Sequence, residues 1–302
     1  MLFAGFEERS FRLDEVEIFA RTAGEGAPLL LLHGYPQTGA MWNRIAGRLA
    51  DSFRVVVPDL RGYGRSSCPP NDADNRAYSK RTMAADMVRL MHELGHERFL
   101  VAGHDRGGRV GYRMALDHPE RVAALSVLDI VPTQAMWAGM DLKLGMKAYH
   151  WLMLAQPYPL PERLIGADPV WYLDWTIASW TKRKSLDGFE TEALAEYRAS
   201  FSDPDHLHAS CNDYRAGRTF DLAADEADLA AGRKIACPVQ ALWGAAGFPA
   251  DTGTPLDAWK PWCAGSLEGR AIDAGHFIVE ENPDDTLAAL LPFLEKSREL
   301  LR

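Results

Sequence analysis

Residues 101–108 read Val-Ala-Gly-His-Asp-Arg-Gly-Gly. The apolar residues at the start predict a buried strand, the glycines a tight turn, and the residues after Arg106 a helix. A strand–turn–helix of the form glycine-x-nucleophile-x-glycine exposes its central side chain, here Asp105, at the end of the strand. An aspartate before a helix is also a good N-cap. Whether Asp105 is a nucleophile or a cap therefore depends on what the rest of the chain places near it.

Short apolar runs on both sides of this turn predict a sheet. Continuous runs without alternation are typical of strands buried on both faces, and they occupy residues 28–32, 53–57, 99–102, 124–128 and 239–243. Amphipathic stretches lie between or after them, with apolar residues at helical spacing, such as residues 80–94 and 286–301. This order predicts an α/β fold with a mostly parallel, doubly wound sheet.

Residues 133–220 have a different character. Tryptophan and tyrosine are dense there, prolines recur, and no β-rich run appears. The pattern predicts four or five short helices. We therefore expect an α/β core of residues 1–132 and 221–302, interrupted by an all-helical cap, or lid, domain of residues 133–220.

The composition excludes several classes of protein. The chain has 302 residues, 33 Lys+Arg against 42 Asp+Glu for a formal net charge of −9, and 47% hydrophobic residues. This apolar content excludes intrinsic disorder, and the acidic balance argues against a nucleic-acid partner. No apolar run approaches the roughly 18 residues of a membrane span, and the first residues do not form a secretion signal. Four widely spaced cysteines predict free thiols in a cytoplasmic protein, with neither disulfides nor a zinc site.

Two further segments support a catalytic role for Asp105. His33-Gly34-Tyr35-Pro36 follows an apolar strand and resembles the HGxP turn of α/β-hydrolases, whose backbone N–H groups form half of an oxyanion hole. The amides of Tyr35 and Arg106 would be the two donors. His276 follows the last strand and completes the order nucleophile, acid, base, although a histidine at such a place can also be an ordinary surface residue.

The acid that orients His276 has two candidates. Many α/β-hydrolases place it after the strand that ends here at Trp243, but this chain has no carboxylate there until Asp251. Asp129 instead follows the strand before the helical insertion, at the carboxyl edge of the sheet where such folds bind ligands. We favour Asp129 over Asp251 for this reason.

Over its whole length the sequence resembles the α/β-hydrolase superfamily and, more closely, the fluoroacetate (haloacetate) dehalogenases. The resemblance rests on HGYPQT (33–38), DLRGYG (59–64), GHDRGGR (103–109), VLDIVPT (127–133), YHW (149–151), DYRAG (213–217) and AGHF (274–277). It implies an α/β-hydrolase fold, a homodimer, and a short halo acid and water as the reactants.

The residue types fit that chemistry. An aspartate nucleophile suits attack on an alkyl carbon, because the product is an ester that water can later open. Arg106 and Arg109 lie one turn apart beside Asp105, and two guanidinium groups can bind a carboxylate in a fork geometry. The alternative is that they are surface charges on a helix.

Stabilisation of the leaving halide would come from the cap. Tyr149-His150-Trp151 and Asp213-Tyr214-Arg215 are the candidate segments, and His150, Trp151 and Tyr214 match the halide pocket of the family. Their N–H and O–H groups are three donors for a small anion; otherwise they would be packing residues of the cap. Tyr35 and Trp180 would line the pocket. Tyr35 departs from the family pattern, which has phenylalanine at this position in close relatives.

The sequence thus predicts hydrolytic dehalogenation of short 2-halo carboxylates by Asp105, His276 and Asp129. No metal ion or organic cofactor is needed, since the side chains supply nucleophile, base and charge stabilisation. An epoxide hydrolase shares the aspartate nucleophile, but Arg106 and Arg109 argue against it. A non-catalytic receptor for a small carboxylate is a further alternative, which the retention of nucleophile, base and acid disfavours.

Overall fold

The chain forms an eight-stranded sheet with the strand order β1-β2-β4-β3-β5-β6-β7-β8. The computed structural model describes residues 2–252 and 254–301. The strands are β1 (Glu7–Leu13), β2 (Val16–Ala23), β3 (Ala27–Leu32), β4 (Phe53–Pro58), β5 (Phe99–His104), β6 (Val122–Leu128), β7 (Val239–Gly244) and β8 (Leu267–Ile272). From β4 to β8 all neighbours are parallel, and β1 and β2 add an antiparallel edge. The predicted α/β class and mostly parallel sheet are confirmed.

The central strands carry the apolar runs that the sequence showed. Every residue of β5 and β6 is buried, as expected for strands covered on both faces. The prediction missed β1, β2 and β8. β1 (EERSFRL) and β8 (LEGRAI) are edge strands with exposed residues, so they lack a continuous apolar run, and the paired β2 is interrupted by charged residues.

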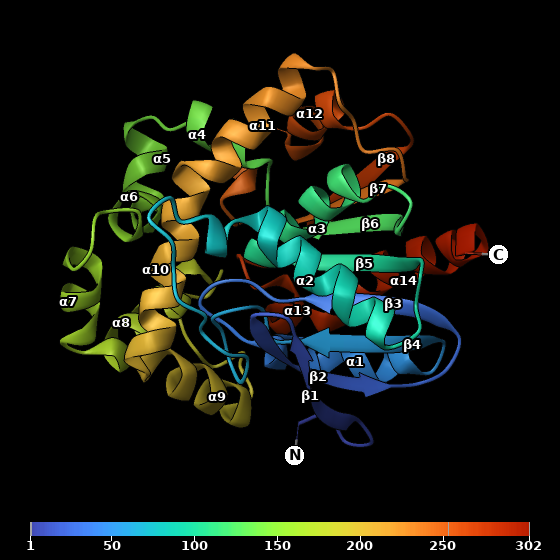
Figure 1. Ribbon diagram of the computed structural model, residues 1–302, viewed down its shortest axis with the longest axis horizontal. Helices are drawn as coiled ribbons and strands as arrows, with labels where there is room; N and C mark the ends of the chain where they lie inside the picture. Colours follow the sequence, from blue (N-terminus) through green and yellow to red (C-terminus); the bar gives the residue numbers. More distant parts are fainter. Residues whose placement is uncertain (1, 253, 302) are drawn as a thin grey trace.

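Helices cover both faces of this sheet (Figure 1). The core helices are α1 (Asn43–Ala50), α2 (Lys80–Glu93), α3 (Arg106–Asp117), α12 (Pro255–Trp259), α13 (Ile278–Glu281) and α14 (Pro283–Ser297). Short 3-10 helices are η1 (Gly39–Trp42), η2 (Arg76–Tyr78), η3 (Pro249–Thr252), η4 (Lys260–Trp262) and η5 (Arg298–Leu301). α2 and α3 pack together on one face, while α1 and α14 pack on the other.

Between β6 and β7 the described chain is helical. These helices are α4 (Thr133–Ala138), α5 (Leu142–Lys147), α6 (Tyr149–Leu154), α7 (Leu160–Gly166), α8 (Pro169–Trp180), α9 (Thr191–Ser202), α10 (Pro204–Arg218) and α11 (Phe220–Ala230). We call residues 133–230 the helical segment. It extends along one side of the sheet, with α5 to α8 farthest out, in green to yellow-green in Figure 1, and α10 between them and the core.

The predicted number of four or five helices in this region was wrong. Three of the helices, α4, α5 and α6, have only six residues each and follow one another closely. Helices of this length show too few turns for a periodic apolar pattern. The helical run also continues ten residues past position 220, because α11 ends at Ala230. The division into core and cap domains stays a prediction.

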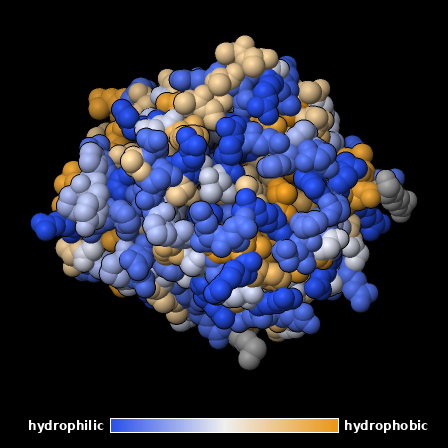
Figure 2. All heavy atoms as spheres, in the orientation of Figure 1, coloured by the Kyte–Doolittle hydropathy of each residue, from blue (hydrophilic) through white to orange (hydrophobic). Residues whose placement is uncertain are grey.

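Figure 2 shows one face of the molecule. Hydrophilic residues dominate the face in Figure 2, with scattered apolar patches. None of the helices in the described residues has the length and apolar character to cross a bilayer. Cys68, Cys211, Cys237 and Cys263 carry free thiols.

Candidate active site

Asp105 occupies a tight turn between β5 and α3. Its backbone has φ 46° and ψ −116°, a conformation that L-residues rarely adopt. The turn has no space for side chains at its flanks, since a Cβ on Gly103 would lie 2.5 Å from the carbonyl oxygen of Gly107. The Asp105 side chain does not cap α3. The N-cap alternative for this carboxylate is therefore not what the structure shows.

His276 and Asp129 lie next to each other, 147 positions apart in the sequence. The His276 Nδ1 atom is 2.5 Å from Asp129 Oδ2. Asp129 Oδ1 accepts a hydrogen bond from the Gly244 amide at 2.8 Å, and Asp129 itself has a φ of 54°. The other imidazole nitrogen, Nε2, is buried without a hydrogen-bond partner among the described residues. The side chain of Asp251, the competing candidate, lies outside the described part of the structure.

The charges in this cluster favour an ionised Asp105 and a more basic His276. Burial raises the pKa of Asp105, but His276, His104, Arg106 and Arg109 together outweigh burial and lower it. Burial lowers the pKa of His276, but its hydrogen bond to Asp129 and the nearby carboxylates raise it above the usual value. The Tyr35 amide donates to Asp105 Oδ1 at 2.9 Å, so the predicted oxyanion-hole donor lies beside the carboxylate.

Arg106 is fully buried and already engaged on one edge. Its Nε lies 3.1 Å from both carboxylate oxygens of Asp213, and its Nη2 donates to the Asp213 carbonyl at 2.8 Å. Lys80 forms an ion pair with the same carboxylate, and the Tyr63 hydroxyl donates to it at 2.8 Å. The pKa of Asp213 is lowered because Arg106 and Lys80 outweigh the effect of burial. Only Nη1 of Arg106 is left without a partner in the described chain.

Arg109 is held in a similar way by the chain that leaves β6. Its Nη1 donates to the Val131 carbonyl at 3.1 Å and to the Thr133 hydroxyl at 3.0 Å. Its Nε is buried and unpartnered among the described atoms. In the described structure Arg106 therefore presents one unpartnered nitrogen, Nη1, and Arg109 presents Nε. The sequence predicted that the two guanidinium groups bind a carboxylate, and it did not indicate that other parts of the chain already hold both of them.

The three predicted halide donors come together on α6 and α10. The His150 ring centroid is 5.7 Å from that of Tyr214, and the Trp151 centroid is 6.0 Å from it. Burial lowers the pKa of His150 to about 3, so its imidazole is neutral and carries one N–H. Burial raises the pKa of Tyr214 well above its usual value, so the phenol keeps its proton. All three side chains are buried.

A small cavity of about 20 Å³ lies in front of Asp105. This is the scale of one or two water-sized molecules, so the site suits a compound of a few heavy atoms. Six predicted residues line it: Asp105, Arg109, Asp129, His150, Trp151 and His276. Apolar side chains complete the wall, including Ile130, Met136 and Phe248.

The other predicted residues, Arg106 and Tyr214 included, are not part of this lining. Tyr35 and Trp180 pack against the His150 ring, with centroids 6.3 and 4.3 Å away. Arg215 points elsewhere, since its Nη1 pairs with Glu162 at 2.8 Å. Asp213 forms an ion pair with Arg106. As a carboxylate it cannot donate a hydrogen bond to a halide.

Sequence reasoning missed the residues that support the site. The buried Lys80 beside Asp213, the Thr133 hydroxyl on Arg109, and the apolar wall residue Phe248 belong to this group. Lys80 starts an amphipathic helix, where a lysine normally faces solvent, so its sequence context carries no signal. Among the described residues no group of three or more His, Cys, Asp or Glu is placed to hold a metal ion.

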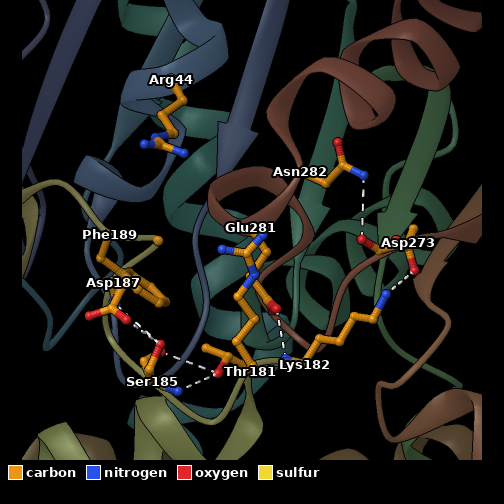
Figure 3. Close-up of a pocket in the computed structure, with 11 residues that line it drawn as sticks. Arg44, Thr181, Lys182, Ser185, Asp187, Phe189, Asp273, Glu281 and Asn282 are labelled. Carbon is orange, nitrogen blue, oxygen red and sulfur yellow. Dashed lines mark hydrogen bonds and ion pairs between the residues drawn. The ribbon is translucent and has the colours of Figure 1, made fainter.

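Glu281 holds the loop that carries His276, and Figure 3 shows its contact with Lys182. The Glu281 carboxylate accepts hydrogen bonds from the amides of Gly275 at 3.0 Å, Phe277 at 3.1 Å and Lys182 at 2.7 Å. The first two bracket His276, and the third ties the loop after α8 to it. A cavity of about 510 Å³ opens beside this contact, lined by Arg44, Glu281 and Phe189 among others. No predicted site residue lines that cavity.

Comparison with known proteins identifies the fold family of the chain. A family model described as the alpha/beta hydrolase fold matches residues 27–283. A fluoroacetate dehalogenase from Burkholderia sp. is 44% identical over 297 residues, which cover 98% of this chain and 96% of the relative. A soluble epoxide hydrolase from Corynebacterium sp. (strain C12) is 34% identical over 281 residues, with 92% and 93% covered.

Solved structures agree with this. A Pseudomonas aeruginosa protein provisionally described as an epoxide hydrolase has a TM-score of 0.93 and 48% identity, and covers 100% of this chain and 99% of its own. A protein of Nostoc sp. PCC 7120, provisionally described as an alpha/beta hydrolase, has a TM-score of 0.94 and 47% identity, with 97% and 99% covered. By its sequence, its sheet and these relatives, the chain belongs to the α/β-hydrolase fold family.

Proposed function

We propose that this hydrolase removes halide from short 2-halo carboxylates, giving the 2-hydroxy acid and a halide ion. The fluoroacetate dehalogenase at 44% identity supports this reaction class. Asp105 is the nucleophile, His276 the base and Asp129 the residue that orients the base. Arg106 and Arg109 bind the carboxylate, and His150, Trp151 and Tyr214 stabilise the leaving halide.

The reaction has two stages. Asp105 attacks the α-carbon of the substrate through one carboxylate oxygen, and the carbon–halogen bond breaks with its electron pair leaving on the halide. His276 then takes a proton from a water molecule, whose oxygen adds to the Asp105 carboxyl carbon. The backbone amide of Tyr35 stabilises the resulting oxyanion. Collapse expels the hydroxy acid, which takes the proton from His276. Asp105 retains one oxygen from water and releases the second proton of that water to solvent as it returns to the carboxylate.

One observation carries the proposal. Five buried polar atoms without partners among the described residues belong to predicted site residues: the Tyr35 hydroxyl, Arg106 Nη1, Arg109 Nε, His150 Nδ1 and His276 Nε2. An unpaired buried polar group costs about 1–3 kcal/mol, so such a set calls for partners from outside the chain. Two cationic donor edges fit a carboxylate better than an epoxide, which has no charge.

Halide release provides the test. Purified protein should release fluoride from fluoroacetate and chloride from chloroacetate, and should hydrate styrene oxide poorly. Fluoride is followed with an ion-selective electrode, chloride by a colorimetric assay and diol by chromatography. Rapid diol formation without halide release would instead assign the chain to the epoxide hydrolases among its relatives.

We expect Arg106→Lys to reduce kcat/KM for chloroacetate roughly 10- to 100-fold. Lysine cannot bond the Asp213 edge and also present a second donor in the position of Nη1, and a hydrogen bond to a charged group is worth about 1.5–3 kcal/mol. The ratio of kcat/KM for chloroacetate to that for chloroacetamide should fall as well, because the amide lacks the anion. Arg89→Lys, on the exposed side of α2, is the control. An unchanged ratio would separate Arg106 from carboxylate recognition.

The halide donors should matter more for fluoride than for chloride. His150→Ala, Trp151→Phe and Tyr214→Phe are each expected to lower kcat for fluoroacetate on the order of 10- to 1000-fold, the range for a preorganised donor. The loss for chloroacetate should be smaller, because fluoride holds its developing charge more compactly. The deciding quantity is the fluoroacetate-to-chloroacetate ratio of kcat in each variant.

Trp137→Phe is a matched control for the tryptophan variant. Trp137 packs 5.3 Å from Trp151, but its indole N–H donates to the Gly217 carbonyl at 3.2 Å. Its replacement should leave the ratio unchanged. Equal losses for both substrates in all three donor variants would mean that these side chains only pack the helical segment.

We also propose a homodimer. Large exposed apolar side chains gather on α5 to α8: Leu142, Met146, Leu152, Tyr158, Leu160, Leu164, Val170, Trp171 and Trp175. Apolar surface concentrated in this way is typical of an interaction face, and a second copy of the chain is the partner that the family resemblance implies. Sedimentation velocity of the purified protein measures the mass in solution.

A further inference from the structure

A second cavity, of about 160 Å³, lies outside the catalytic one. It opens between the helical segment and the loop after β7. Lys147 at the end of α5 and Lys184 after α8 contribute to one side, and Gly247 and Phe248 of the loop contribute to the other. We call it the outer cavity and the space in front of Asp105 the inner cavity.

Very little separates the two cavities. Phe248 lines both of them, and its ring centroid is 5.8 Å from that of His276 and 6.0 Å from that of His150. Trp180 also lines the outer cavity, with its ring 5.4 Å from His276. Gly247 lies so close to the catalytic acid that a Cβ there would be 2.5 Å from Asp129 Oδ1. A molecule in the outer cavity is therefore one aromatic ring away from the reacting groups.

The charged side chains that line the outer cavity are opposite in sign to the net charge of the chain. Its charged lining residues are Lys147 and Lys184, with no aspartate or glutamate among the described lining. Lys147 Nζ lies 5.6 Å from the centre of the Phe248 ring, and Lys184 Nζ donates to the Ser179 carbonyl at 2.6 Å. The chain as a whole has a net charge of −9, which repels small anions at long range. A local positive pair at the entrance offsets this repulsion and raises the association rate.

We propose that the outer cavity is the entrance for the anionic substrate, with Lys147 and Lys184 attracting a small carboxylate and the Phe248 ring closing the passage to Asp105. This rests on the proposed function, because a halo acid is the anion to be admitted. The ligand class is a monocarboxylate of two or three carbons, set by the small inner cavity. The lysines act on entry and do not touch the bound substrate.

The test measures association without chemistry. Asp105→Asn serves as the background, since the amide cannot act as nucleophile, and chloroacetate binding is followed by stopped-flow tryptophan fluorescence. Lys147→Gln together with Lys184→Gln should lower the association rate constant about tenfold at 10 mM ionic strength. The dissociation constant should change less than the association rate constant. The difference from the parent should largely disappear in 0.5 M salt.

The matched control is Lys234→Gln together with Lys296→Gln. Both lysines are exposed and lie outside the lining of the outer cavity, so this pair changes the net charge equally. An association rate constant equal in the two double variants would refute the proposed entrance. This holds even if halide release from the unmodified enzyme supports the proposed function. Absence of chloroacetate binding in the background variant, together with no halide release by the unmodified chain, would overturn both.

Discussion

His276→Asn is expected to release one equivalent of halide per Asp105 and then stop. The first stage needs only the carboxylate nucleophile and the donors around the halide, whereas opening the ester needs a base for the water. Steady-state turnover should fall by a factor on the order of 10⁴ or more, as when the base of another catalytic triad is removed. A rapid-quench halide assay gives the burst, and mass spectrometry of the peptide that contains Asp105 detects the trapped ester.

Two controls make this result specific. His118→Asn, on the loop after α3, should turn over at the normal rate, because His118 is remote from the cavity lining. A single turnover of the unmodified enzyme in heavy-oxygen water should place the label on Asp105 before it appears in product. An unmodified Asp105 peptide after a stoichiometric burst would refute the assignment of His276, and label found only in the hydroxy acid would refute that of Asp105.

Asp129→Asn is expected to have the next largest effect, a loss of about 10⁴-fold in kcat, as for the orienting carboxylate of a serine-protease triad. An amide at this position can hold the imidazole in the wrong tautomer and removes the negative charge 2.5 Å from Nδ1. The acidic limb of the pH–rate profile reports the loss of neutral His276 as pH falls through its pKa. Since Asp129 raises that pKa, the limb should move to lower pH in the variant.

Asp251→Asn separates the two acids that the sequence left in competition. It should retain near-normal kcat with an unshifted acidic limb, because Asp129 already occupies the Nδ1 side of His276. A larger loss in Asp251→Asn than in Asp129→Asn would transfer the orienting role to Asp251.

The fold and the chemical groups of the site were predictable because local signals carry them. The turn around Asp105 requires glycines, because its backbone leaves no space for a Cβ. A turn of that kind can be recognised from a few residues of sequence. Asp129 could be preferred because the carboxyl ends of parallel strands meet at one edge of the sheet. Helix and strand types followed from apolar patterns where elements were long and buried.

What could not be predicted depends on pairs distant in sequence. Asp213 takes one edge of Arg106 over 107 positions, and Lys80 reaches the same carboxylate over 133 positions. No local pattern in the sequence indicates which edge of a guanidinium is occupied. The sequence therefore did not predict that Arg106, in the described structure, has only Nη1 free to bind a carboxylate. The short helices α4 to α6 and the edge strand β1 were missed because their patterns are too brief or too exposed to repeat.

The two unusual backbone angles have an evolutionary consequence. Asp105 at φ 46° and Asp129 at φ 54° are both held where an L-residue loses roughly 1–3 kcal/mol relative to an ordinary conformation. Native domains have a margin of only about 5–15 kcal/mol over the unfolded state. Under the proposed function, resistance to heat and catalytic competence therefore compete at these two positions, and a lineage selected for thermostability alone would drift toward glycine at both.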